Sequence, residues 1–436
     1  MRLCFVADLN SIHSQKFIRF FPPRGHEVLV ISTTRFPSDG FRGARVASVG
    51  AGPGRGNRGS LGGTTRAIAR RLERVAIAGA AVDPKLQIKW IRRQIERELD
   101  RDLSDRLRFY TANRERVGEL VRGFNPDLLQ CLRLPVEGYL GAHAGHPRTL
   151  HFCWGNDLTL YASQYPDYAT LTREALSQAA GFLTDCHRDA RLARQWGLPD
   201  GTPALVTPGG GGLELGALPR TGAPAAWPSV PPAAPPAASP PTSHAGGPVV
   251  FLTLRGLGGR YTDNVPVVRA IPSLRELIGD GFVLRFTGSP EPYAPLLRAE
   301  ARCLNASRFI EFTGRIPHER VAALIAASDF IFSATYHDGT PNSMLETMRY
   351  GGIPLCSDLE SIREWITDGE NGYLFDMKDP EQIARTFARA VGEKDKHPAM
   401  RERNVRLIEE RAEYGGCMAR VEEFYLRMMG GQREPA

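Results

Sequence analysis

Two carboxylates stand eight residues apart in the segment HDGTPNSMLETMRYGGIP, which covers residues 337–354. Asp338 lies in a loop after an apolar stretch, and Glu346 lies about one turn into the helix that the next residues predict. With Thr340 as N-cap and Pro341 as first residue, this helix directs its free N–H groups out of its end. Carboxylates accept hydrogen bonds from hydroxyls, whereas N–H groups and cations hold phosphate. The segment therefore predicts a site for a ligand with hydroxyls at both ends and phosphates between them.

A second segment supplies positive charge. The Gly-rich turn RGLGGRY follows an apolar stretch at residues 249–254. Such a turn lets the backbone approach a phosphate, and Arg255 and Arg260 place two cations beside it. Because no Asp-x-Asp stands near this turn to bind a divalent ion, we expect the two cations to neutralise the phosphates, with no metal and no cofactor in the site.

Short apolar stretches alternate with helical ones along most of the chain. This alternation predicts parallel sheets covered by helices on both faces, and ligands bind such sheets at the carboxyl ends of the strands. We therefore expect an α/β protein with two doubly wound Rossmann-like domains facing one cleft. The predicted strands are residues 3–7, 28–31, 128–132, 149–154, 249–254, 282–286, 309–312, 330–333 and 353–356, and the predicted helices of the second half are 264–278, 293–304, 318–327, 341–350 and 361–367.

The segment around the two carboxylates resembles the acidic signature of family 4 of the retaining glycosyltransferases, which have the GT-B fold. In that family an acid, seven residues and a Glu precede a small-residue turn and a strand, and Asp338 and Glu346 match this spacing. The resemblance implies that Glu346 holds the nucleotide ribose and that Asp338 contacts the transferred sugar. It also implies that Arg255 and Arg260 grip the diphosphate. These roles make Asp338, Arg255 and Arg260 the expected catalytic residues.

The same resemblance supplies the rest of the expected donor site. In the family a Gly-Arg-Ile stretch lines the base pocket through its backbone, and FTGSPEP at residues 286–292 is a further match. The expected donor-binding residues are Glu346, Gly339, Thr340, Pro341, Asn342, Ser343, Met344, Gly256, Gly288, Gly314, Arg315 and Ile316.

The acceptor side is expected in the first domain. SIHSQKF after the first strand resembles a loop of one branch of the family, so His13, Ser14 and Lys16 are expected at the cleft, a surface His being the alternative. Many members carry a His where Trp154 stands here. Asn156 and Asp157 are the nearest replacements, although Asp157 could equally cap a helix.

Four parts are predicted along the 436 residues. Residues 1–217 form the N-terminal, acceptor-side domain. Residues 218–248 are Pro, Ala, Ser and Gly with almost no large apolar side chain, which is typical of a linker. Residues 249–400 form the nucleotide-sugar-binding domain, and residues 401–436 form helices whose apolar stripe packs back on the first domain.

Composition excludes several other classes. The seven cysteines are scattered without a CxxC pair, which argues against a disulfide framework or a zinc site. No run of ~18 apolar residues is present, so we expect a cytoplasmic protein. Eight arginines against the single acid Glu73 lie between Gly40 and Ala80. This Arg-rich stretch fits contact with an anionic membrane or a lipid-linked or phosphorylated acceptor, and equally a solvated helix face; nucleic acid is not an expected partner.

The resemblance implies transfer of a hexosyl group from a nucleoside diphosphate sugar to an acceptor hydroxyl with retention of configuration. One alternative is a non-catalytic nucleotide- or sugar-binding protein of the same fold. The other is a dinucleotide-dependent oxidoreductase, which would need a GxGxxG turn and an acid after the next strand, where Arg285 and Thr287 stand. The base, the sugar, the acceptor, the linkage and the oligomeric state are not readable from the residues.

Overall fold

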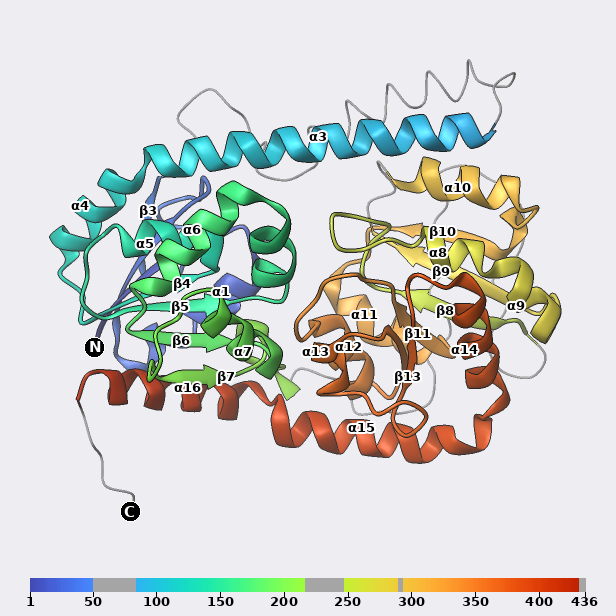
Figure 1. Ribbon diagram of the computed structural model, residues 1–436. Helices are drawn as coiled ribbons and strands as arrows, with labels where there is room; N and C mark the ends of the chain where they lie inside the picture. The colour runs from blue at the N-terminus through green and yellow to red at the C-terminus, as the bar shows by residue number, and fades with distance from the viewer. Residues whose placement is uncertain (50–83, 216–246, 289–292, 431–436) are drawn as a thin grey trace.

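Two parallel sheets, each covered by helices, make up the protein (Figure 1). The computed structural model describes residues 1–49, 84–215, 247–288 and 293–430. The two Rossmann-like domains expected from the alternation of strands and helices are confirmed. Most of the predicted linker and the greater part of the Arg-rich stretch lie outside the described residues.

The first sheet has the strand order β3-β2-β1-β4-β5-β6-β7, with every neighbouring pair parallel. Its strands are β1 (Arg2–Ala7), β2 (Glu27–Ser32), β3 (Arg45–Ser48), β4 (Leu128–Leu132), β5 (Thr149–Cys153), β6 (Gly181–Thr184) and β7 (Ala204–Val206). Its helices are α1 (Ile12–Ile18), α3 (Pro84–Ala112), α4 (Arg114–Phe124), α5 (Tyr139–Ala142), α6 (Pro166–Ser177) and α7 (His187–Gln195), with 3₁₀ or π turns η1 (Pro22–Arg24), η2 (Leu134–Gly138), η3 (Asp157–Ala162) and η4 (Gly209–Gly211).

The second sheet has the order β10-β9-β8-β11-β12-β13 and is also parallel throughout. Its strands are β8 (Val249–Thr253), β9 (Phe282–Thr287), β10 (Ile310–Gly314), β11 (Phe330–Ser333), β12 (Ile353–Ser357) and β13 (Tyr373–Phe375). Its helices are α8 (Val265–Arg269), α9 (Ile271–Ile278), α10 (Tyr293–Cys303), α11 (Val321–Ala326), α12 (Asn342–Arg349), α13 (Glu360–Arg363) and α14 (Pro380–Gly392), with turns η6 (Ser307–Phe309), η7 (His318–Arg320) and η8 (Lys394–Lys396).

Each sheet has one point where the order of its strands reverses. In the first sheet this point lies between β1 and β4, and in the second it lies between β8 and β11. Successive loops leave the two central strands in opposite directions there, which opens a crevice at their carboxyl ends. Ligand sites are therefore expected after β1 and β4, and after β8 and β11.

The last helix returns to the first domain. Along the lower side of the molecule in Figure 1, α15 (His397–Arg411) lies under the second domain and α16 (Tyr414–Met428) under the first. The Tyr425 ring stacks on Phe21 at 5.4 Å, and its hydroxyl donates to Oε1 of Gln130 at 2.8 Å. Ile408 of α15 packs instead with Met344 of the second domain. The boundary expected at residue 400 thus differs from the structure, because only α16 covers the first sheet.

The long helix α3 also links the domains. Its 29 residues run across the top of both in Figure 1. Ile88, Ile91 and Ile95 are buried in the core of the second domain, although they precede most of the first sheet in sequence. The prediction assigned residues 1–217 to the first domain, but the first part of α3 packs with the second domain.

Three predicted helices differ from the observed ones. The helix expected at 264–278 is divided at Ala270 into α8 and α9, because Pro272 has no N–H to donate to the preceding turn. The helix expected at 361–367 is the shorter α13, and residues 318–327 form η7 followed by α11.

Candidate active site

Asp338 and Arg255 meet at the switch point of the second sheet. Arg255 follows β8, and Asp338 lies in the loop after β11, so strand order alone brings the two loops side by side. Nη2 of Arg255 forms an ion pair with Oδ2 of Asp338, and both side chains are largely buried. Oδ1 of Asp338 also accepts the N–H of Gly339 at 3.0 Å. The carboxylate and the guanidinium predicted for one site are therefore in contact.

Helix α12 begins close to this pair, because Ser343 and Met344 of its first turn line a small pocket together with Arg255. The helix begins at Asn342, with Pro341 in an extended conformation as N-cap, one residue later than expected. Thr340 does not cap it, because its hydroxyl donates to the carbonyl oxygen of Asp185 and accepts from Nε1 of Trp365. The N–H of Met344 bonds to Pro341. The free N–H groups expected at this helix end are therefore those of Asn342 and Ser343, which precede any intrahelical acceptor.

Glu346 lies farther along α12, with 18% of its side chain exposed. Burial raises the pKa of this carboxyl, while His318 and Lys16 lower it. Nδ1 of His318 lies 3.9 Å from Oε1 of this carboxyl. A largely buried carboxylate with such loose partners is able to accept hydrogen bonds from a ligand's hydroxyl groups.

Arg260 lies apart from the ion pair. Its Nη1 bonds to the Tyr165 hydroxyl and to Oδ1 of Asp100 at 3.3 Å, so it reaches the first domain and α3. Its Nη2 is buried and has no hydrogen-bond partner among the described residues. Arg260 must therefore exchange these contacts before it can meet a diphosphate.

Two glycines set the shape of the phosphate turn. Gly256 and Gly288 have φ of +77° and +113°, and a Cβ on Gly288 would lie 2.9 Å from Cα of Gly256. Two strand-end loops therefore touch backbone to backbone, which only glycine allows here. Gly314 also has a positive φ, of +73°, at the end of β10. Arg315 next to it is exposed, and Ile316 packs beside a small apolar cluster.

The two domains touch directly beside Asp338. A Cβ on Gly155 would lie 2.2 Å from the backbone nitrogen of Gly339, and one on Gly339 would lie 2.1 Å from Oδ1 of Asp185. The structure therefore shows the cleft closed at this point. Asp185 was not predicted as a site residue, because nothing in its own segment indicates that the second domain lies against it.

Arg188 of the first domain forms hydrogen bonds to both domains at this contact. It was not predicted as a site residue from the sequence. Its Nη1 donates to the carbonyl oxygen of Asp338 at 2.6 Å and to Oγ of Ser361 at 2.9 Å. Its Nη2 donates to the carbonyl oxygen of Gly155 at 2.9 Å. Glu364 of the second domain accepts the N–H groups of His187 and Arg188, both at 2.9 Å, at the start of α7. Glu364 is therefore an interdomain cap rather than a free surface side chain.

Of the three acceptor-side residues expected on this segment, only His13 is hydrogen-bonded to a described residue of the second domain. His13 crosses the cleft, where its Nδ1 accepts from Nδ2 of Asn342 at 2.8 Å, and burial lowers its pKa to about 4. Ser14 is buried. Lys16 donates to the carbonyl oxygen of Gly212 and lies 5.4 Å from the centre of the Tyr414 ring. These residues lie on α1, not on the polar loop expected there.

Asp157 is a structural anchor. It is fully buried, forms an ion pair with Arg133, and accepts the N–H groups of Leu134 and Trp154, each at 3.1 Å. Asn156 accepts from the same guanidinium at 2.8 Å. The prediction that these two side chains replace a sugar-contacting His is wrong for Asp157, because its oxygens are used within the fold.

A metal site is not apparent at the main acidic cluster. Among the described residues, Asp185, Cys186 and Asp189 bring three ligand-type atoms together. Arg188 occupies one oxygen of Asp189 at 2.8 Å, and burial raises the pKa of Asp185. A guanidinium therefore already supplies the positive charge that a cation would bring.

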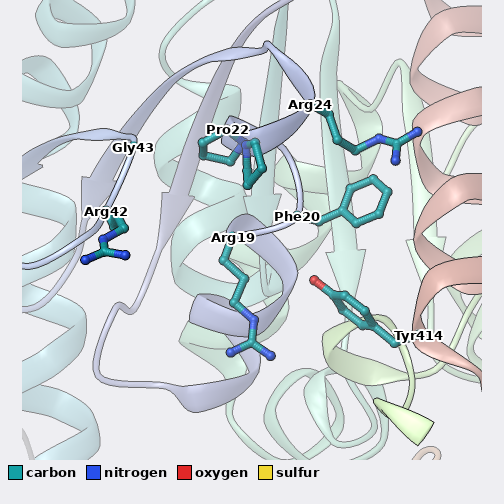
Figure 2. Close-up of a pocket in the computed structure, with 8 residues that line it drawn as sticks. Arg19, Phe20, Pro22, Arg24, Arg42, Gly43 and Tyr414 are labelled. Atoms are coloured by element: carbon teal, nitrogen blue, oxygen red, sulfur yellow. The ribbon is translucent and has the colours of Figure 1, made fainter. Parts of the chain in front are cut away.

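One hollow in the described surface lies outside the cleft. It has a volume of about 660 Å³ and is lined by Phe20 and Tyr414 together with Arg19, Arg24 and Arg42 (Figure 2). Arg19 is paired with Glu214, and Arg24 is paired with Glu422. Because two of its three cations are already neutralised, this hollow is a poor match for a diphosphate.

Comparison with known proteins finds a family match within the second domain. Residues 262–407 match the family model of the Glycosyl transferases group 1. The match contains Asp338 and Glu346 but not Arg255 or Arg260. A stretch of 126 residues is 28% identical to an uncharacterized glycosyltransferase of Methanocaldococcus jannaschii, covering 29% of this chain and 32% of that protein. The shared stretch thus spans about a third of that relative.

Solved structures share the fold over nearly the whole chain. Sucrose-phosphate synthase from Thermosynechococcus elongatus superposes with a TM-score of 0.67 at 13% identity, covering 99% of this chain and 100% of that one. The Anabaena protein HepE in complex with UDP and glucose gives a TM-score of 0.64 at 12% identity, covering 97% and 99%. At these identities the likeness shows the fold, which is GT-B. Family 4 membership and retention stay predictions.

Proposed function

We propose that this protein is a glycosyltransferase that moves a hexosyl group from a nucleoside diphosphate sugar to an acceptor hydroxyl, with retention of configuration. The observation that carries the proposal is the meeting of Asp338, Arg255 and the amino end of α12 at the switch point of the second sheet. A cation and free N–H groups suit a diphosphate, and the carboxylates of Asp338 and Glu346 suit sugar hydroxyls.

Stabilisation of the leaving group is the proposed source of the rate enhancement. As the bond between the anomeric carbon and the diphosphate breaks, negative charge grows on the departing oxygen, and Arg255 lies where it can meet that charge. Arg260 joins it by releasing Tyr165 and Asp100. The acceptor oxygen forms the new bond to the anomeric carbon, and its proton passes to the departing phosphate.

No metal or cofactor is part of the proposed reaction. Two arginines and the end of α12 supply the positive charge that Mg²⁺ supplies in other phosphate sites. The nucleotide sugar is a substrate. HepE was solved with UDP and glucose, which makes UDP-sugars the first donors to try.

The proposed reaction takes place in the closed form of the cleft. Arg188 holds the carbonyl group of Asp338 from the first domain, so the loop that carries the catalytic carboxylate is fixed only when the domains meet. His13 reaches Asn342 at the same place. A closed, dry site strengthens each charge interaction within it.

Peripheral contact with an anionic membrane belongs to the same proposal but rests on the Arg-rich stretch. Most of that stretch lies outside the described residues. No helix within the described ranges is long and apolar enough to span a bilayer. Salt-sensitive co-sedimentation with anionic vesicles is the expected behaviour, and absence of binding at low salt would contradict it.

A panel of nucleotide sugars tests the proposed activity. UDP-, GDP- and ADP-hexoses are incubated with the protein, and release of the nucleoside diphosphate is followed with and without simple glycosides as acceptors. We expect release from at least one donor and loss of that release in Arg255→Ala. Binding without release would favour the non-catalytic alternative, and oxidation or reduction of a nicotinamide cofactor would favour the oxidoreductase.

A further inference from the structure

We propose that Tyr165 and Asp100 compete with the donor diphosphate for Arg260, so that these two residues lower the affinity for the donor. The inference rests on the proposed function and adds to it a control of the donor site from outside. Tyr165 directly precedes α6 of the first domain, and Asp100 lies in α3. Both are remote in sequence from the strand-end loops of the second sheet, which form the donor site.

The backbone that carries Arg260 is joined to the loop after β11. The N–H of Gly259 donates to the carbonyl oxygen of Thr262 at 2.8 Å, which closes a tight turn. Arg260 and Tyr261 form the tip of this turn. The carbonyl oxygen of Tyr261 accepts the N–H of Tyr336, in the loop after β11, at 2.8 Å. The side chain of Arg260 is therefore the part that can change partners while its backbone stays in the donor site.

The two arginines of the phosphate turn have acidic partners of different origin. The Arg255 guanidinium lies 5.5 Å from the centre of the Tyr261 ring, and its partner Asp338 belongs to the same domain. Nη1 of Arg260 lies 3.3 Å from Oδ1 of Asp100, on the long helix that crosses both domains. The charge of Arg260 is thus engaged from outside the donor site.

This contact uses the hydrogen-bond donors that a phosphate needs. Nη1 of Arg260 carries two hydrogens, and it bonds to both the Tyr165 hydroxyl and Asp100. The guanidinium also lies 5.2 Å from the centre of the Tyr165 ring. The Arg260 side chain is only 11% exposed, and its Nη2 is inaccessible to solvent. A phosphate can therefore reach these nitrogens only by displacing Tyr165 and Asp100.

The contact is weak enough for a ligand to displace it. The Asp100 side chain is 66% exposed, and ion pairs of this kind contribute little to stability. Nη2 of Arg260 has no hydrogen-bond partner among the described residues, so the guanidinium is incompletely bonded in this position. A diphosphate offers several charged oxygens at once. It would also repel the Asp100 carboxylate, which makes the two sets of partners exclusive.

The arrangement of the domains decides whether Arg260 has these partners. Tyr165 packs against a core cluster of the first domain. On α3, Ile95 is buried in the core of the second domain and Leu107 packs with that of the first. Asp100 lies between them, where α3 passes from one domain to the other (Figure 1). Movement between the domains therefore changes the availability of Arg260, and with it the affinity for the donor.

Calorimetry with nucleoside diphosphates tests the inference. UDP, GDP and ADP are titrated into the parent protein, and the nucleotide that binds is used with the variants. Tyr165→Phe keeps the ring but removes the hydroxyl. It should bind the nucleotide about three- to tenfold more tightly, because Arg260 is free in a larger fraction of the molecules. A partly unfolded variant would bind more weakly, so a defect in folding cannot produce this result.

Tyr139→Phe, at a tyrosine of the same apolar cluster, is the matched control and should stay within about twofold of the parent protein. An affinity of Tyr165→Phe that is weaker than that of the parent protein, or less than about threefold tighter, would overturn the inference. Tyr165 would then help Arg260 to bind the donor or would have no part in donor binding.

Two further variants test the mechanism of competition. Asp100→Asn should tighten binding more than Glu96→Gln, an exposed acid of the same helix that controls for the loss of one negative charge. In an Arg260→Ala background, Tyr165→Phe should change the affinity by less than about twofold, because the contested cation is absent. Equal effects of the two acid variants, or a tightening that persists without Arg260, would contradict competition for this side chain.

The outcomes also separate this inference from the proposed function. If the parent protein binds none of the three nucleotides, the proposed function fails and the inference fails with it. If Arg260→Ala binds as tightly as the parent protein, Arg260 is not a ligand of the diphosphate and the inference is wrong. If Arg260→Ala weakens binding about tenfold or more while Tyr165→Phe behaves like Tyr139→Phe, only the inference fails.

Discussion

Arg188 joins the two domains through a single guanidinium group. It is 7% exposed, and its four hydrogen bonds go to Asp189, Gly155, Asp338 and Ser361, the last two across the cleft. A planar fork of five donors is suited to this arrangement, whereas an ammonium group is not. The loop that carries Asp338 is therefore held in part by a side chain of the opposite domain.

Replacing this fork should impair turnover more than folding. In Arg188→Lys the charge is kept but most of the fixed hydrogen bonds are lost, each worth roughly 1.5–3 kcal/mol when charge-assisted. We expect kcat to fall by about 10- to 100-fold. Arg191→Lys on the same helix, where Arg191 forms an exposed pair with Glu360, is the control. Equal kcat values for the two variants would contradict this role.

Glu137 is a buried acid beside a second acid. Burial, followed by the nearby charge of Asp8, raises its pKa from 4.5 to about 7, although Thr33 and Arg133 act in the opposite direction. A raised pKa in the folded state means that the proton is held more tightly there than in the unfolded chain. The stabilisation is full below pH ~4.5 and is lost as the pH rises through ~7.

Glu137→Gln should remove this pH dependence. Relative to the variant, the parent protein is expected to lose on the order of 3 kcal/mol of unfolding free energy between pH 4 and pH 8. Denaturant unfolding at both pH values measures the difference, with Glu119→Gln on the surface of α4 as control. A constant difference between parent and variant at the two pH values would show that the pKa of Glu137 is the same in the folded and unfolded states.

Some site residues could be predicted from the sequence and others could not. The spacing of Asp338 and Glu346 and the Gly-rich turn at Arg255 are local patterns, and each lies within one segment at the end of one strand. Arg133 and Glu137 have no such pattern. They matter because strand order places β4 beside β1, and because Arg133 adopts φ +112° to reach Asp157.

At the scale of elements, the loops after β5 and β11 touch backbone to backbone between the domains. Gly155 and Gly339 meet with no room for a side chain on either. Both glycines stand in segments that the sequence identified, Trp-Gly-Asn-Asp and His-Asp-Gly-Thr, but their mutual contact has no sequence signature. A methyl group at either position must separate the two loops.

Gly155→Ala is therefore expected to hold the cleft open. Its Cβ would overlap the backbone of Gly339, which cannot move aside as a flexible side chain could. We expect kcat/KM to fall more than tenfold and the radius of gyration from small-angle scattering to increase. Gly123→Ala in α4, where a Cβ meets nothing within 4 Å, is the control. Wild-type activity in Gly155→Ala would show that closure at this point is not required.

Each of the predicted strands is present, and most of their bounds agree within one residue. The strands at β4 and β11 have the predicted bounds, and those at β1, β5, β8, β9 and β12 differ by one residue at one end. The strands β3, β6, β7 and β13 were not predicted, because stretches of three or four residues carry little periodic pattern. The stretch before β4 was expected to be helical, but the length of α3 was not predicted.

At the scale of the whole molecule, two helices beyond the two sheets hold the domains together. α16 returns under the first domain, and α3 crosses both along the opposite side (Figure 1). The sequence predicted the first of these crossings from its apolar stripe. It could not predict the second, because the partners of Ile88, Ile91 and Ile95 lie about two hundred residues away in the chain.

The complete protein should work without a divalent ion. If Arg255, Arg260 and the end of α12 neutralise the diphosphate, turnover should be the same, within about twofold, with EDTA and with added magnesium. The measurement is release of nucleoside diphosphate from the preferred donor under both conditions. Loss of turnover in EDTA with recovery on addition of magnesium would show that the two arginines do not suffice.

Donor binding by Glu346→Gln tests the central claim most directly. The account places Glu346 at the ribose, where its carboxylate accepts charge-assisted hydrogen bonds worth ~1.5–3 kcal/mol. Isothermal titration with the nucleoside diphosphate of the preferred donor should show affinity about 10- to 150-fold weaker than in the parent protein, with Glu409→Gln, an exposed glutamate of α15, unchanged. Parent-like affinity in a folded Glu346→Gln protein would contradict the donor site described for this cleft.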